Sequence, residues 1–98
     1  PGPGVEMPVP LSFPSARYPA AARGRGIRVD VHLDILVDES GKVLEAVVRE
    51  GDTSGLGFNE AAVDAVLGTR FQPATRWDLP GKAWTELIIQ FEEGTASP

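Results

Sequence analysis

Cysteine is absent from the 98 residues, which excludes a disulfide-stapled fold and a thiolate metal site. This absence fits a reducing cytosol and an unstapled periplasmic domain equally well. Basic residues are also few: nine Lys and Arg stand against fourteen Asp and Glu. The resulting net charge of −5 disfavours the phosphate backbone of a nucleic acid or an anionic lipid surface as partner. We therefore expect no nucleic-acid partner.

Long apolar runs are missing too. No run approaches the roughly 18 residues that a membrane span needs, and the N-terminus lacks the regions of a signal peptide. A chain this short suits one small domain. Five prolines and two glycines among the first fourteen residues predict a Pro/Gly-rich linker end over 1–14, followed by the domain over 15–93 and a flexible tail over 94–98.

What the chain does contain is a long alternation of apolar and polar residues over 27–37, with a period of two that indicates a β-strand. Residues 38–41 form a turn sequence that ends in glycine, and a second apolar stretch begins at Val43. This pattern predicts a β-hairpin. The expected register pairs Val37 with Lys42, Ile35 with Leu44, Leu33 with Ala46 and Val31 with Val48.

Two helices are expected beside this hairpin. A short one over 19–25 follows from an alanine run after Pro19, and a longer one over 60–69 begins after Asn59, a favourable N-cap residue. After a turn at Pro80 and Gly81, alternation over 83–91 predicts a last strand. The fold class is thus α+β: a three-stranded antiparallel sheet with a β-hairpin, packed on one face by two helices.

The shared faces of these elements predict the core and a second apolar surface. We expect the core to contain Tyr18, Leu33, Ile35, Phe58, Val63, Val66, Leu67, Phe71, Leu87 and Ile89. The opposite face of the sheet carries Leu36, Val43, Val47, Trp84 and Ile88, which is more apolar than a solvated face requires.

Chemistry-bearing residues are sparse. His32 lies between Asp30 and Asp34 on the polar face of its strand, and we expect it to be solvated rather than bound to a metal. Asp34 and Glu45 are expected to lie opposite one another, yet an open face without a nucleophile disfavours acid–base catalysis. The sequence predicts no enzyme, no metal site and no cofactor.

Five short motifs recur in the order and spacing of a known family. They are Tyr18-Pro19 with Ala22, Arg25-Gly26-Ile27, the segment VDESGKV at 37–43, Glu60-Ala61-Ala62, and Arg70-Phe71-Gln72-Pro73-Ala74. Over about residues 15–92 the chain resembles the C-terminal domain of the TonB family of energy transducers. Each motif is weak alone, and their joint occurrence carries the resemblance.

The resemblance implies a function as well as a fold. It implies a periplasmic domain of a Gram-negative bacterium, joined through a Pro-rich linker to an inner-membrane anchor and motor proteins. Its partner would be an extended segment of an outer-membrane transporter, added as a strand to the edge of residues 84–91. The implied partner-binding residues are Pro14, Ser15, Ala16, Arg17, Trp84, Glu86, Ile88, Ile89 and Gln90.

Two features depart from the family pattern. Gly68-Thr69 stands where many members carry an aromatic-basic run, and the chain is acidic where many members are basic. The partner could therefore differ from an iron-siderophore or vitamin transporter. The alternative function is a structural or assembly domain of an envelope-spanning machine for motility or secretion, or a homodimer formed through the same edge strand.

Overall fold

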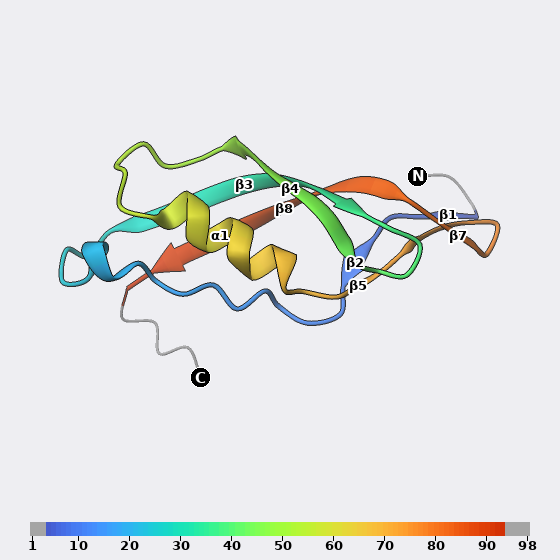
Figure 1. Cartoon of the computed structure of the whole chain (residues 1–98), viewed down its shortest axis with the longest axis horizontal. Coiled ribbons are helices and arrows are strands. Elements are labelled where there is room, and N and C mark those ends of the chain that lie inside the picture. Colours follow the sequence, from blue (N-terminus) through green and yellow to red (C-terminus); the bar gives the residue numbers. More distant parts are fainter. Residues whose placement is uncertain (1–3, 94–98) are drawn as a thin grey trace.

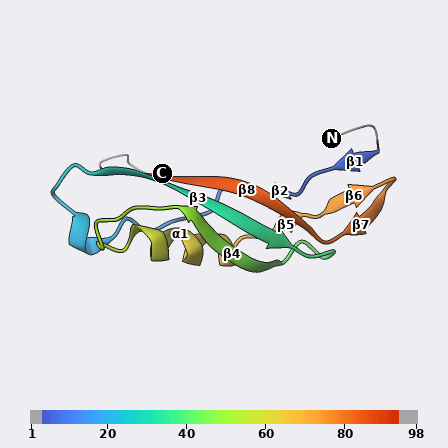
Figure 2. The ribbon, with the colours of Figure 1, turned by 90° about the horizontal axis from the view of Figure 1, so that it is seen from above.

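The computed structural model describes residues 4–93 and has an α+β architecture. Its main sheet is antiparallel with the order β4-β3-β8, formed by β3 (Arg28–Val37), β4 (Val43–Glu50) and β8 (Ala83–Glu92). Helix α1 (Phe58–Leu67) lies across one face of this sheet (Figures 1 and 2). The tail expected over 94–98 lies outside the described residues.

The turn between β3 and β4 is built around Asp38. Its carboxylate accepts hydrogen bonds from the Ser40 N–H at 2.9 Å, the Ser40 hydroxyl at 2.7 Å and the Lys42 N–H at 2.9 Å. Gly41 adopts a φ of +87°, and a Cβ there would lie 1.9 Å from the Phe71 carbonyl oxygen. The predicted hairpin is confirmed, and its glycine is required both by conformation and by space.

The predicted register of this hairpin is wrong. Val37 pairs with Val43 and Leu36 with Glu45, so Leu44 is an extra, bulged residue in β4. Ile35 then faces Ala46 and Leu33 faces Val48. The bulge turns Val43 into the core, although its odd spacing from Ala46 would otherwise place the two on opposite faces. The expected position of Val43 on the open face is therefore also wrong.

The expectation of two covering helices is wrong as well. The alanine run forms only a three-residue 3₁₀ turn, η1 (Ala20–Ala22), which leaves α1 as the one α-helix among residues 4–93. Gly57, not Asn59, is the N-cap of α1. The Asn59 side chain instead accepts from the Asp52 N–H at 2.8 Å and donates to the Asp52 carbonyl at 2.9 Å. Asn59 thus secures the loop before the helix.

Two small sheets extend one end of the molecule (Figure 1). β1 (Val5–Glu6), β6 (Ala74–Arg76) and β7 (Leu79–Gly81) form a three-stranded sheet, and β2 (Val9–Pro10) pairs with β5 (Phe71–Gln72). The turn expected at Pro80 and Gly81 is shifted, since these residues lie in β7. The chain turns instead at Trp77 and Asp78, whose φ angles of 52° and 68° suit a tight hairpin turn.

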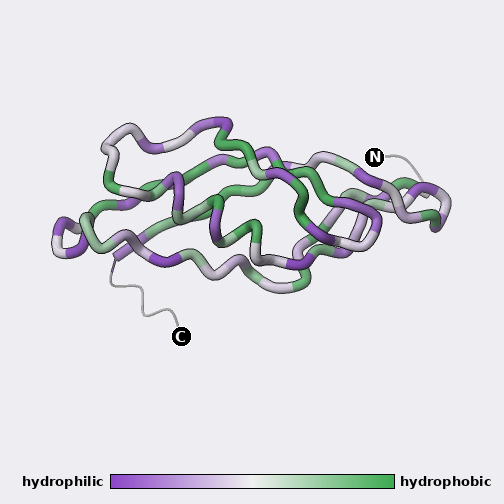
Figure 3. Tube along the Cα trace, viewed as in Figure 1, coloured by the Kyte–Doolittle hydropathy of each residue, from purple (hydrophilic) through white to green (hydrophobic). Residues whose placement is uncertain are grey.

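The core lies between α1 and the main sheet, where apolar segments from both meet (Figure 3). Of the predicted core, six residues are buried and Tyr18, Val63 and Leu87 pack against them. Leu67 is the exception, because it is 48% exposed. The buried stripe of α1 is Phe58, Ala62, Ala65 and Val66, and Leu67 falls beside that stripe at the end of the helix.

Leu33 in β3 and the bulged Leu44 in β4 are a matched pair of leucines for testing this packing. Leu33 is 1% exposed, and Leu33→Ala should lower the free energy of unfolding by about 2 to 5 kcal/mol, because the lost contacts leave a cavity. Leu44 is 43% exposed, and Leu44→Ala should cost less than about 1 kcal/mol. Urea unfolding of both variants measures the difference. Equal losses would contradict the assignment of the two faces.

Candidate functional site

β8 is an edge strand of the main sheet. All ten of its residues pair with β3, from Ala83 opposite Val37 to Glu92 opposite Arg28. No other strand of residues 4–93 pairs with its second side. Backbone groups alternate in direction along a strand, so every second residue of β8 points its N–H and C=O away from β3. Such an edge is a template for one more strand.

A groove of about 550 Å³ runs beside this edge. One wall is β8 itself, and the other is the chain from the last residue of β2 toward η1. Among residues 4–93, no charged side chain lines it. The lining residues are Pro10, Phe13, Pro14, Ser15, Ala16, Leu87, Ile88, Ile89 and Gln90.

The structure brings six of the nine sequence-predicted site residues together in this groove: Pro14, Ser15, Ala16, Ile88, Ile89 and Gln90. Ile88 is 50% exposed, while Ile89 is 6% exposed and turns its side chain into the core. Ile89 can therefore offer little to a partner except its backbone.

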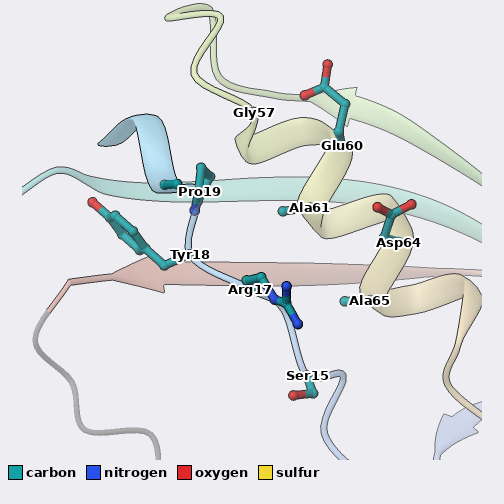
Figure 4. A pocket seen from close by; sticks show the side chains of 10 residues that line it. Ser15, Arg17, Tyr18, Pro19, Gly57, Glu60, Ala61, Asp64 and Ala65 are labelled. Carbon is teal, nitrogen blue, oxygen red and sulfur yellow. The ribbon is translucent and has the colours of Figure 1, made fainter. Parts of the chain in front are cut away.

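The other three predicted residues lie elsewhere. Arg17 lines a separate hollow of about 490 Å³ between the chain before η1 and the outer face of α1, opposite Glu60 and Asp64 (Figure 4). Trp84 and Glu86 line a third hollow of about 440 Å³, together with Met7 and Arg49. The predicted set is thus divided among three hollows.

Three groove residues were not predicted: Pro10, Phe13 and Leu87. Phe13 is the most notable, because its side chain is 96% exposed. A signal for it exists in the sequence, since apolar residues alternate with others from Val5 to Phe13. The prolines between them favoured the interpretation of this segment as a linker.

The open face of the main sheet is apolar in part, as expected. Val47, Trp84 and Ile88 are 47%, 47% and 50% exposed. Two polar pairs also lie on it: Asp34 accepts from Arg49 at 3.0 Å, and His32 lies 3.7 Å from the Glu50 carboxylate.

The expected contact between two carboxylates on this face is wrong. Asp34 lies opposite Val47 because the bulge shifts β4, and its carboxylate is bound by an arginine instead of facing Glu45. Among residues 4–93, no group of three or more His, Cys, Asp or Glu could hold a metal ion. The described helix is also too short to cross a membrane.

The far end of β8 is tied to the loop after η1. The backbone N–H groups of Gly24 and Gly26 both donate to the Glu93 carboxylate, the latter at 3.0 Å. These hydrogen bonds lower the pKa of Glu93 below its ordinary value, because they favour the charged form. Close by, Tyr18 donates to the Ile27 carbonyl at 2.7 Å. Burial, aided by the charge of Glu93, raises the pKa of the Tyr18 hydroxyl.

An aromatic chain continues from this tie into the core. The Tyr18 ring meets the Phe58 ring edge-on at 5.4 Å, and Phe58 meets Phe91 of β8 at 5.2 Å. Edge-to-face pairs of this kind add to the stabilisation from burial alone. They hold the segment before η1, α1 and β8 in one fixed arrangement at this end of the groove.

The tie at Glu93 predicts a pH dependence. A lowered folded-state pKa contributes stability above the unfolded pKa of about 4.3, and this stability is lost as the pH falls through the folded value. Between about pH 5 and pH 3, the melting temperature of the wild type should therefore fall more steeply than that of Glu93→Gln. Thermal melts across this range measure both. Parallel curves would contradict a role for the charged tie.

Another prediction concerns metals. Stoichiometric zinc or EDTA should leave the melting temperature unchanged, because His32 has no second histidine and no cysteine to complete a zinc site. His32→Gln is the control and should behave identically. A zinc-dependent rise of several degrees in the wild type alone would overturn this expectation.

Comparison with known families adds an independent finding. The model of the C-terminal domain of Gram-negative bacterial TonB proteins matches residues 14–92. No curated protein matches the chain. The matched range contains β3, β4, α1 and β8, and it includes the groove beside β8 except for Pro10 and Phe13.

Proposed function

The chain belongs to the family of C-terminal domains of Gram-negative bacterial TonB proteins, and on this basis we propose that it is the partner-binding domain of a periplasmic energy transducer. In this function the domain grips an extended segment of an outer-membrane protein, which adds as a strand to β8. An inner-membrane anchor and its motor proteins connect to the domain from the N-terminal side. The function requires no catalytic residue and no cofactor.

The observation that carries this proposal is the second side of β8, which has no strand beside it in residues 4–93 and borders a groove without charge. Main-chain hydrogen bonds to such an edge supply affinity with little demand on sequence. A partner that fills the groove would bury none of the charged side chains of residues 4–93, because none of them lines it. Binding therefore avoids the free-energy cost of removing a charge from water.

A second function uses the same edge. β8 of one copy can pair with β8 of another, which would make the domain a dimerisation or assembly module of an envelope-spanning machine. The two functions predict a different oligomeric state of the free domain as its concentration rises. Strand addition by a partner leaves the free domain monomeric, whereas the assembly function predicts a dimer that a proline in β8 dissociates. Sedimentation of the free domain separates them.

Backbone pairing predicts a specific mutational pattern. One of the adjacent residues Ile88 and Ile89 directs its N–H away from β3, and proline at that position should abolish partner binding, because the donor is lost. Glu86→Ala should change the affinity less than about threefold, since its side chain lines a separate hollow outside the groove and backbone pairing makes little demand on side chains. NMR titration with N-terminal peptides of outer-membrane transporters measures both effects.

The folded state of each proline variant is checked first by its amide spectrum. Ile88 is half exposed, so Ile88→Pro should destabilise the sheet only if it removes a hydrogen bond to β3, and this identifies the outward position. Ile89→Pro also removes a buried side chain, and Ile89→Ala is its control for that loss. Strand addition would be refuted if the largest amide chemical-shift changes fell on α1 instead of β8. It would also be refuted if a folded variant with proline at the outward position bound as well as wild type.

A further inference from the structure

Residues 11–18, called the strap below, run from β2 past the groove to η1. One end is held by the Leu11 N–H, which donates to the Arg70 carbonyl at 2.9 Å. The other end is held by Ala16 and Tyr18, which pack against the core. Between these points, no hydrogen bond or ion pair with any residue of 4–93 involves Ser12 to Ser15. The strap is thus fixed at both ends and unbonded in its middle.

Phe13 lies in this unbonded middle and stands apart from the other phenylalanines. It is 96% exposed, while Phe58, Phe71 and Phe91 are 1%, 2% and 4% exposed. It nevertheless lines the groove with Leu87 and Ile88 of β8. A large aromatic side chain in this position gains its burial free energy only when something else enters the groove. The family match begins at Pro14 and therefore assigns Phe13 no role.

We propose that the strap is a clasp that covers the partner peptide on β8, with Phe13 as its apolar contact. The peptide then has a backbone partner on one side and the Phe13 ring on the other. This inference rests on the proposed function, because it requires a peptide on β8. The groove volume of about 550 Å³ lies within the usual range of ligand sites, roughly 300 to 1,000 Å³, and leaves room for a peptide without displacement of the strap.

The clasp has a physical advantage over an edge alone. Strand addition fixes the peptide on one side only, and its other backbone edge and side chains stay in water. An apolar cover excludes that water, and contacts that do so slow dissociation more than they speed association. Phe13 should therefore act mainly on the dissociation rate.

The first test compares two alanine variants of the strap. With the transporter peptide that binds tightest in the titration of β8, Phe13→Ala should weaken binding roughly tenfold to a hundredfold, the equivalent of burying one phenylalanine side chain. Most of the loss should appear as faster dissociation. Leu11→Ala is the matched control: Leu11 is 64% exposed on the same strap but does not line the groove, and its variant should bind like wild type.

The second test observes the ring directly. Uniform fluorophenylalanine labelling gives one ¹⁹F resonance for each of the four phenylalanines, and Phe13→Leu identifies the exposed one. Saturation with the same peptide should abolish the solvent isotope shift of the Phe13 resonance, because the ring leaves water. The three buried rings serve as internal controls.

The outcomes separate the two proposals. If the peptide shifts β8 amides but Phe13→Ala binds as tightly as wild type, or if the Phe13 ring keeps its solvent isotope shift at saturation, the clasp is wrong and strand addition stands. If no transporter peptide binds to β8 of the wild type, the proposed function fails, and the clasp fails with it.

Discussion

The central position of β3 is the constraint on which the rest of the structure depends. It is the strand of the main sheet with partners on both sides, and its side chains at Val31, Leu33, Ile35 and Val37 are at most 1% exposed beneath α1. Because β3 fixes the position of β8 through ten pairs, it also fixes which side of β8 is left without a strand. The position of the groove is therefore set by β3, although no residue of β3 lines it.

The parts of the fold that the sequence predicts are those set by local pattern. The alternation in β3 and β8, and the Asp38 turn with its glycine, need no knowledge of distant residues. The bulge at Leu44 was not predictable in this way, because Val43 and Leu44 are both apolar and either could face inward. Packing against the rest of the core decides between them. The same limit applies to η1, where helix propensity favoured a helix that tertiary contacts do not continue.

The candidate site likewise has one half that local sequence pattern predicts and one half that it does not. Its β8 half follows from alternation and from the family resemblance, and six of the predicted residues do meet in one groove. Its other half depends on β1 and β2, which pair with strands far later in the chain. The alternation from Val5 to Phe13 indicates an extended chain, but it does not reveal the pairing, since proline favours an extended chain whether or not that chain is docked. Phe13 was missed for this reason.

The lengths of the ladders have a mechanical consequence. β1 and β2 are each joined to the domain by two residue pairs, whereas β8 is joined to β3 by ten. A load applied from the N-terminal side reaches the two short ladders first, and only two residue pairs hold each of them. The long ladder bears the load only afterwards, along its full length. The domain would therefore yield in small steps, and lengthen toward the source of the pull, before the strand that carries the proposed grip is strained.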